Sequence, residues 1–161
     1  MPVVRVGIAE GVVCPAPAVL ITAGLGSCVG VTFWDPFTRI GGMVHVMLPD
    51  SRQGRAADNW AKYADLAIPE MVARLQRTGV PPRRLVVKMC GGAQMFNFGL
   101  QDPRFAIGER NVEAVIRALD ALGLKVHARD TGGNYGRTMT LDLSSGAVTV
   151  RSIGHGVRVL V

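Results

Sequence analysis

The chain has 161 residues, a length that suits a single domain with a hydrophobic core of its own. Hydrophobic residues make up 48% and charged residues 19%, which is typical of a compact globular protein and excludes long disordered segments. The net charge is +6, but the basic residues are scattered, so the charge favours an acidic partner surface over a nucleic acid.

In the first half of the chain the apolar pattern predicts strands at residues 3–8, 19–22, 29–34 and 40–48. The last two flank residues 35–39, a turn-rich connection suited to a hairpin. Residues 51–57 are mostly polar and predict a loop. A helix follows over residues 57–77, with Asp58 as its cap and with Pro69 expected to kink or divide it.

In the second half, strands are predicted at residues 85–89 and 124–128, with a helix over residues 111–122 between them that ends at Gly123. Residues 130–137 predict a loop, which could also line a substrate groove. Residues 139–143 and 147–152 predict a hairpin. Many strands, two main helices and hairpin links together predict an α+β fold with largely antiparallel sheet, in one domain over residues 1–161.

Residues 11–34 carry no charge, so a membrane-spanning segment has to be considered. Prolines and glycines interrupt this stretch, and its second half is rich in β-branched residues, which predicts buried strands and no membrane insertion. The three cysteines are odd in number and lack C-x-x-C spacing, which argues against a disulfide framework and a zinc site. We therefore expect a cytoplasmic protein without a metal or other cofactor.

The densest local motif covers residues 22–30. It fits neither the dinucleotide fingerprint, since Val29 stands in the last glycine position, nor the P-loop, which needs G-K-[ST]. Residues 26–30 read G-x-C-x-G, like a nucleophile elbow with cysteine in place of serine. An elbow requires a following helix, however, and here strand composition follows.

A cysteine nucleophile needs a base, and the hairpin brings His45 close to Cys28. Simple pairing across a five-residue loop sets Val29 opposite His45, so Cys28 and His45 would point to opposite faces. One extra residue, as a bulge at Gly30 or at residues 41–42, would restore a shared face. We predict such a register offset. From the residues alone, a packing role for both side chains stays open.

Five blocks, in order along nearly the whole chain, resemble the CheD family of chemoreceptor glutamine deamidases. They are TAGLGSCVG (22–30), GMVHVMLP (42–49), KMCGGAQMF (88–96), IGERN (107–111) and DTGGNYGR (130–137). The one local departure is Cys90, where a larger apolar or aromatic residue is expected. On spacing alone, the IGERN block is the lead-in to a helix.

This resemblance implies that Cys28 is the nucleophile, that His45 is the base, and that Thr22 orients His45. It implies a layered α+β sandwich with helices packed against the sheets, similar to the catalytic domain of the cytotoxic necrotizing toxins. The substrates would be glutamines on methyl-accepting chemotaxis receptors, with a CheC-type phosphatase as a further partner. Gly24, Gly26 and Ser27 would supply oxyanion-hole or substrate-binding backbone groups, with the N–H of Cys28 as a further candidate donor.

Two other functions stay open at this point. One is a thiol acyl-transfer enzyme that uses a different acceptor, because the same Cys–His pair supports several acyl transfers. The other is a non-catalytic adaptor that binds receptors or a CheC-type phosphatase. Reactivity of the Cys28 thiol separates an enzyme from an adaptor, and the product formed on a receptor glutamine separates a deamidase from the other enzymes.

Overall fold

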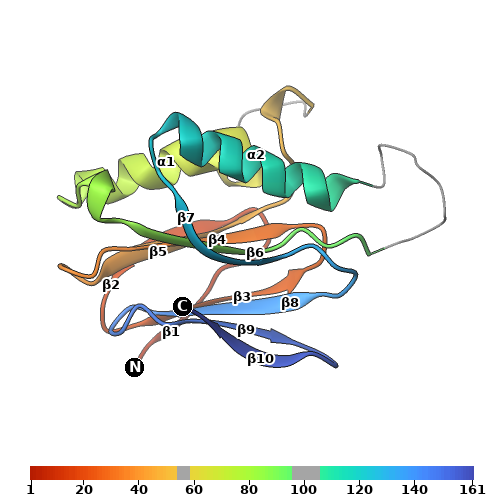
Figure 1. The fold of residues 1–161 in the computed structure, drawn as a ribbon. Helices are drawn as coiled ribbons and strands as arrows, with labels where there is room; N and C mark the ends of the chain where they lie inside the picture. The colour runs from red at the N-terminus through yellow and green to blue at the C-terminus, as the bar shows by residue number, and fades with distance from the viewer. Residues whose placement is uncertain (54–58, 96–105) are drawn as a thin grey trace.

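The computed structural model describes residues 1–53, 59–95 and 106–161. Within them, two five-stranded sheets stack on each other, and two helices cover the outer face of one sheet (Figure 1). The predicted α+β layered sandwich is therefore confirmed. The strands are β1 (Val3–Arg5), β2 (Gly11–Pro15), β3 (Val19–Leu25), β4 (Val29–Trp34), β5 (Ile40–Val46), β6 (Val86–Gly91), β7 (Val126–Thr131), β8 (Arg137–Asp142), β9 (Val148–Ser152) and β10 (Gly156–Leu160). The helices are α1 (Ala64–Arg77), α2 (Ile107–Ala121) and the short 3₁₀ helices η1 (Ser51–Gln53), η2 (Trp60–Lys62) and η3 (Pro82–Arg84).

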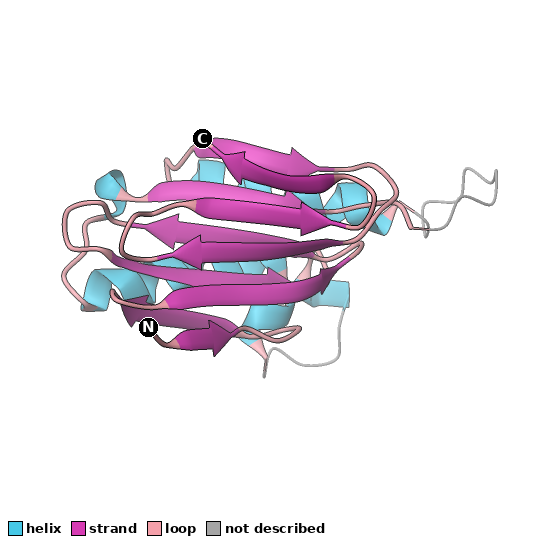
Figure 2. Cartoon of the chain, turned by 90° about the horizontal axis from the view of Figure 1, so that it is seen from below, coloured by secondary structure: helices cyan, strands magenta, loops and turns pink. Residues whose placement is uncertain are grey.

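Sheet 1 has the strand order β1-β3-β8-β9-β10, and sheet 2 has the order β2-β5-β4-β6-β7. Each sheet contains one parallel pair, β1 with β3 and β6 with β7, and its other pairs are antiparallel. The two termini lie at opposite edges of sheet 1, and the helices lie behind sheet 2 when the molecule is seen from below (Figure 2).

The core forms two layers because the residues of β4 alternate between the faces of sheet 2. Val29, Val31 and Phe33 pack with buried residues of α1 and α2. On the other face, Cys28 and Cys90 pack with the inter-sheet cluster built around Leu20, Met43 and Met139. This inter-sheet layer holds the side chain of Cys28.

The segment β6–α2–β7 is a crossover between two parallel strands, and it brings the beginning of α2 to the end of β6. The approach is very close at Gly108. A Cβ added there would lie 2.3 Å from the carbonyl oxygen of Ala93 and 2.6 Å from that of Gly92. Glycine is therefore required in the first turn of α2, and that turn is fixed against the backbone that follows β6.

Several predicted boundaries shift. The helix predicted over residues 57–77 begins as α1 at Ala64, after η2, and runs through Pro69 to Arg77 without dividing. Burial of Ile68, Met71 and Leu75 outweighs the missing backbone hydrogen bond at the proline. Residues 54–58, which include Asp58 and most of the predicted 51–57 loop, lie outside the described residues.

The second helix, α2, begins at Ile107, four residues before the predicted start. Strands β2 and β10 were not predicted, and the predicted loop at residues 130–137 instead begins within β7 and ends within β8. In the described segments, no helix combines the length and the apolar character needed to cross a membrane.

Candidate active site

The hairpin of β4 and β5 has the predicted one-residue offset: Gly30 pairs with His45, and Val29 pairs with Val46. The offset arises in the turn and not at Gly30 or at residues 41–42, where the pairing is regular. Asp35 N donates to Ile40 O (2.9 Å), and Arg39, with a φ of 59°, donates from its backbone N to Asp35 O (2.8 Å). The connection thus takes up one residue more than simple pairing assumes.

This register determines which side chains share a face. Cys28 lies two residues before Gly30, at the entry to β4, and packs with the inter-sheet cluster. His45, opposite Gly30, has no exposed surface, whereas Cys28 is half-buried. The thiol and the imidazole therefore belong to the same face of sheet 2, and the thiol is the one open to solvent.

Thr22 reaches the imidazole from β3 in the opposite sheet. Its hydroxyl donates to the carbonyl oxygen of Val6 (2.6 Å), and Thr22 Oγ1 lies 2.7 Å from His45 Nδ1. A hydroxyl has one proton, so the contact with Nδ1 requires Nδ1–H to donate to Oγ1. This arrangement leaves Nε2 unprotonated in the neutral ring. His45 Nε2 is buried and has no hydrogen-bond partner among residues 1–53, 59–95 and 106–161, so within these segments its lone pair is unoccupied.

Burial determines the protonation of both groups. Desolvation lowers the pKa of His45 to about 4, so the imidazole is neutral at physiological pH. Desolvation raises the pKa of the Cys28 thiol, and a hydrogen bond from the backbone N–H of Cys28 itself acts in the opposite direction. The thiol and the imidazole are therefore both neutral at physiological pH.

The carbonyl groups of Gly26 and Cys28 both point toward the residues that follow β6. Ala93 N donates to Gly26 O (2.8 Å), and Gly92 N donates to Cys28 O (2.9 Å). Because C=O and N–H are antiparallel in a trans peptide, the N–H of Ser27 points away from β6. Among the predicted oxyanion groups, Gly26 N–H is already engaged, since it donates to Gly24 O (3.0 Å).

The other predicted loop residues have different surroundings. Gly24 has a φ of 72° and open space around it, so its conformation and not its packing requires glycine. A Cβ on Gly26 would lie 3.1 Å from Cγ of Met95, so this side chain lies over the loop. In the described part of the chain, neither Ser27 N–H nor Cys28 N–H donates to another residue.

Asn111 is fully buried and contacts this loop from α2, a role that its place in the IGERN block does not predict. A signal was present: Asn111 precedes Val115 by four residues, so a polar side chain falls on the apolar face of the helix.

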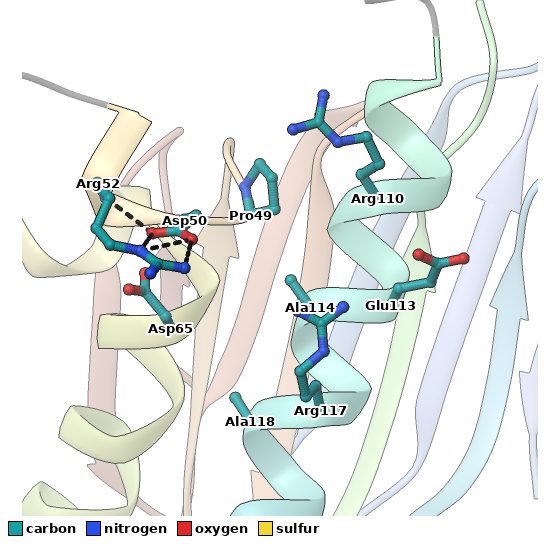
Figure 3. Close-up of a pocket in the computed structure, with 9 residues that line it drawn as sticks. All are labelled: Pro49, Asp50, Arg52, Asp65, Arg110, Glu113, Ala114, Arg117 and Ala118. Atoms are coloured by element: carbon teal, nitrogen blue, oxygen red, sulfur yellow. Dashed lines mark hydrogen bonds and ion pairs between the residues drawn. The ribbon is translucent and has the colours of Figure 1, made fainter. Parts of the chain in front are cut away.

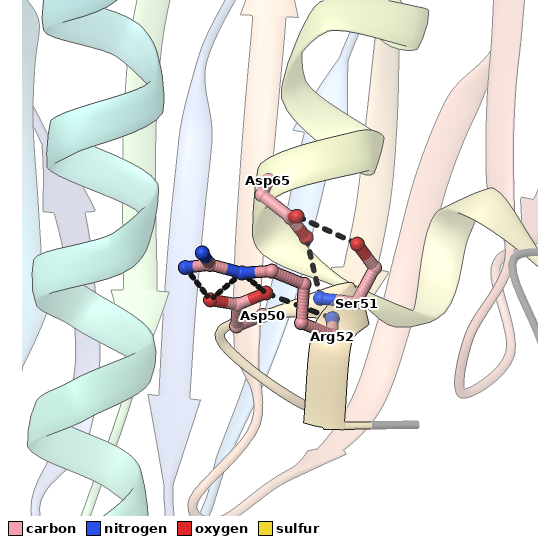
Figure 4. Close-up of polar contacts among 4 residues, drawn as sticks. All are labelled: Asp50, Ser51, Arg52 and Asp65. Atoms are coloured by element: carbon pink, nitrogen blue, oxygen red, sulfur yellow. Dashed lines mark hydrogen bonds and ion pairs between the residues drawn. The ribbon is translucent and has the colours of Figure 1, made fainter. Parts of the chain in front are cut away.

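A cavity of about 420 Å³ lies between α1 and α2, on the helix side of sheet 2 (Figure 3). Three basic residues (Arg52, Arg110 and Arg117) and three acidic residues (Asp50, Asp65 and Glu113) line it. Figure 4 shows how two of the acids are engaged. Asp50 accepts from the Arg52 guanidinium, which lowers the Asp50 pKa to about 2, and Asp65 accepts from Ser51 N and Oγ. The lining thus carries equal numbers of basic and acidic side chains.

Residues 47–152 match the family described as "CheD chemotactic sensory transduction". Three relatives bear the name "Probable chemoreceptor glutamine deamidase CheD". The protein of Moorella thermoacetica is 51% identical over 98% of this chain and 95% of its own. The protein of Desulforamulus reducens is 47% identical over 98% of this chain and 95% of its own. The protein of Clostridium novyi is 43% identical over 98% of this chain and 97% of its own.

Among solved structures, the crystal structure of the Bacillus licheniformis hypothetical protein YfiH aligns with a TM-score of 0.43 and 17% identity. The alignment covers 77% of this chain, and it spans about half (49%) of that chain.

Proposed function

This chain belongs to the CheD family, and from that premise we propose that it is a chemoreceptor glutamine deamidase that uses Cys28 as nucleophile and His45 as base. The observation that carries the proposal is the buried, unpartnered Nε2 of His45 on the face of sheet 2 that also presents Cys28. Thr22 fixes the tautomer that leaves this nitrogen free to accept a proton.

In the first half of the reaction, Cys28 Sγ attacks the carboxamide carbon of a substrate glutamine while His45 Nε2 accepts the thiol proton. The carbonyl oxygen becomes an oxyanion, for which the Ser27 and Cys28 N–H groups are the proposed donors. The tetrahedral intermediate collapses to a thioester. The C–N bond breaks, and the nitrogen leaves as ammonia with the proton from His45.

In the second half, water attacks the thioester and gives its proton to Nε2. The C–S bond then breaks, the proton returns to sulfur, and glutamate remains on the substrate. A neutral resting imidazole suits both halves, because it can accept a proton at each attack. The lowered pKa of His45 favours return of the proton to the leaving group.

The partners follow from the same premise. We propose the cytoplasmic region of methyl-accepting chemotaxis receptors as the substrate, a CheC-type phosphatase as a further partner, and the cytoplasm as the location. The half-buried thiol at the entry of a strand suits a side chain presented on another protein. A single domain over residues 1–161 would hold the entire reaction.

The test is incubation of the full chain with a glutamine-containing receptor fragment, followed by ammonia release and mass spectrometry of the fragment. We predict conversion of glutamine to glutamate by the wild-type protein and its loss in Cys28→Ala and Cys28→Ser. Cys90→Ala is the matched control, because it removes a buried thiol from the neighbouring strand. Activity retained by Cys28→Ala, or lost only in Cys90→Ala, would refute the assignment. A covalent amine adduct in place of glutamate would indicate acyl transfer.

A further inference from the structure

The side chain of Asn111 joins the two segments that carry Cys28 and His45. It has no exposed surface, and its Nδ2 donates to Ser27 O (2.9 Å) and to Met47 O (2.9 Å). Ser27 is the residue before the nucleophile, and Met47 lies two residues after the base. One amide nitrogen from α2 therefore binds both segments at once.

The chemistry of these contacts requires an amide. Both partners are carbonyl oxygens, which only accept, so the group that faces them must supply two N–H donors. Asn111 Oδ1 is buried and has no hydrogen-bond partner among the residues that the structure describes. Reversing the amide would bring Oδ1 against two carbonyl oxygens, and an aspartate would do the same with a charge. The side chain is thus oriented by its donors alone, at the cost of an unpaired acceptor.

The bond to Ser27 O also determines where the next N–H points. The peptide between Ser27 and Cys28 is planar and trans, so its C=O and its N–H point in opposite directions. Asn111 draws the C=O toward α2, and the Cys28 N–H consequently points away from α2, to the side of its own Sγ.

We infer that Asn111 is a positioning residue, which orients the backbone N–H of Cys28 toward the developing oxyanion and fixes the nucleophile loop relative to the strand of His45. The orientation of the N–H is argued from the hydrogen bond and the planar peptide alone. Its role toward an oxyanion rests on the proposed function. Asn111 does not touch the reacting atoms. It acts through the Ser27–Cys28 peptide.

Neighbouring contacts make this role specific. Ala93 N and Gly92 N hold the peptides on either side, through Gly26 O and Cys28 O. The middle peptide, which carries the Cys28 N–H, is held by the Asn111 side chain. Backbone donors cannot be removed by ordinary substitution, whereas this side chain can. Close packing of Gly108 on Gly92 keeps α2 at the distance that the contact needs.

The experiment compares Asn111→Ala and Asn111→Asp with the wild-type chain, and Asn59→Ala, at an exposed asparagine beside η2, is the matched control. We expect kcat for ammonia release to fall about 10- to 100-fold with little change in KM, because an oxyanion donor is misdirected and not removed. Asn111→Asp should be the more severe change. Asn59→Ala should keep wild-type values.

A second readout separates positioning from stability. The pH profile of Cys28 alkylation by iodoacetamide, followed by peptide mapping, reports the thiol pKa. We expect this pKa to rise in Asn111→Ala, since the Cys28 N–H no longer supports the thiolate. If Asn111→Asp does not fold, Asn111→Ala with wild-type circular dichroism serves alone.

The outcomes are distinguishable. A folded Asn111→Ala variant with wild-type kcat and a wild-type alkylation profile overturns the inference. If the wild-type chain releases no ammonia from receptor fragments, the proposed function fails. The alkylation profile then still decides whether Asn111 controls the N–H of Cys28.

Discussion

His45 is buried and has no charged partner in the described segments, so lowering the pH should change both the stability and the activity of the protein. In the unfolded chain the imidazole takes up a proton near pH 6.5, and in the folded protein near pH 4. Between these values the unfolded state binds more protons, so stability falls as the pH falls. The stability that the buried neutral imidazole contributes is complete above pH 6.5 and is lost as the pH drops to about 4.

We predict that the free energy of unfolding decreases by roughly 2–3 kcal/mol from this residue over that interval. Urea titrations at several pH values, with His45→Gln as the reference that lacks the imidazole, measure it. The acid limb of kcat/KM should lie near pH 4, the folded-state pKa. An acid limb near the ordinary histidine value would mean that the imidazole is not buried and neutral.

The three proposed catalytic residues came from the resemblance to a family, with spacing in support for only two of them. Cys28 and His45 lie on flanking strands of one hairpin, so local pairing rules relate them. Thr22 lies in the other sheet, and no rule of strand spacing predicts its 2.7 Å contact with His45. Asn111 was missed for the same reason, because its partners are 84 and 64 residues away in sequence.

At the scale of elements, the end of β6 is held against the nucleophile loop by a glycine. Gly91 has a φ of 110°, and a Cβ there would lie 2.2 Å from the carbonyl oxygen of Cys28. We predict that Gly91→Ala destabilises the protein by roughly 1–3 kcal/mol and also lowers kcat, because the Cys28 peptide must shift. Thermal unfolding and ammonia release measure the two effects.

Gly79 provides the control for this prediction. It follows α1 with a φ of 99°, and a Cβ added there meets nothing within 4 Å. Gly79→Ala therefore has the same backbone strain without the steric contact, and it should reduce stability but leave kcat unchanged. Equal kcat values for the two variants would show that the position of the Cys28 carbonyl does not matter for catalysis.

The elements themselves were predictable where an apolar pattern was long and regular. The bounds of β4 were predicted correctly, and both main helices were found. Strands β2 and β10 were missed. Strand β2 is short and ends in Cys14 and Pro15, and a proline is not typical of a strand interior. Strand β10 is largely exposed and has no alternating core pattern. The register offset was predicted because simple pairing would place Cys28 and His45 on opposite faces of the sheet. Its origin in the turn was not predicted, because it depends on a positive φ at Arg39, which is uncommon for residues other than glycine.

For the whole molecule, the net charge of +6 should act on the encounter with an acidic receptor surface. We predict that affinity for a receptor helical fragment falls as salt rises, since exposed charges are screened beyond about 8 Å at physiological ionic strength. Titrations at two salt concentrations measure this, with a length-matched duplex DNA as the control. Tighter binding to DNA would contradict the proposed partner, and affinity independent of salt would remove charge from recognition.

The contact between Thr22 and His45 bridges the two sheets, and this has a mechanical consequence. The tautomer of the base depends on a 2.7 Å bond between the sheets. The same sheets are also joined by apolar packing, by the Arg137–Asp130 ion pair between β8 and β7, and by the hydrogen bond from Lys88 Nζ to Leu160 O. We therefore expect that hydrostatic pressure, mild denaturant or a bound protein must displace these contacts together to separate Thr22 from His45, and that such a displacement lowers activity while the secondary structure stays intact.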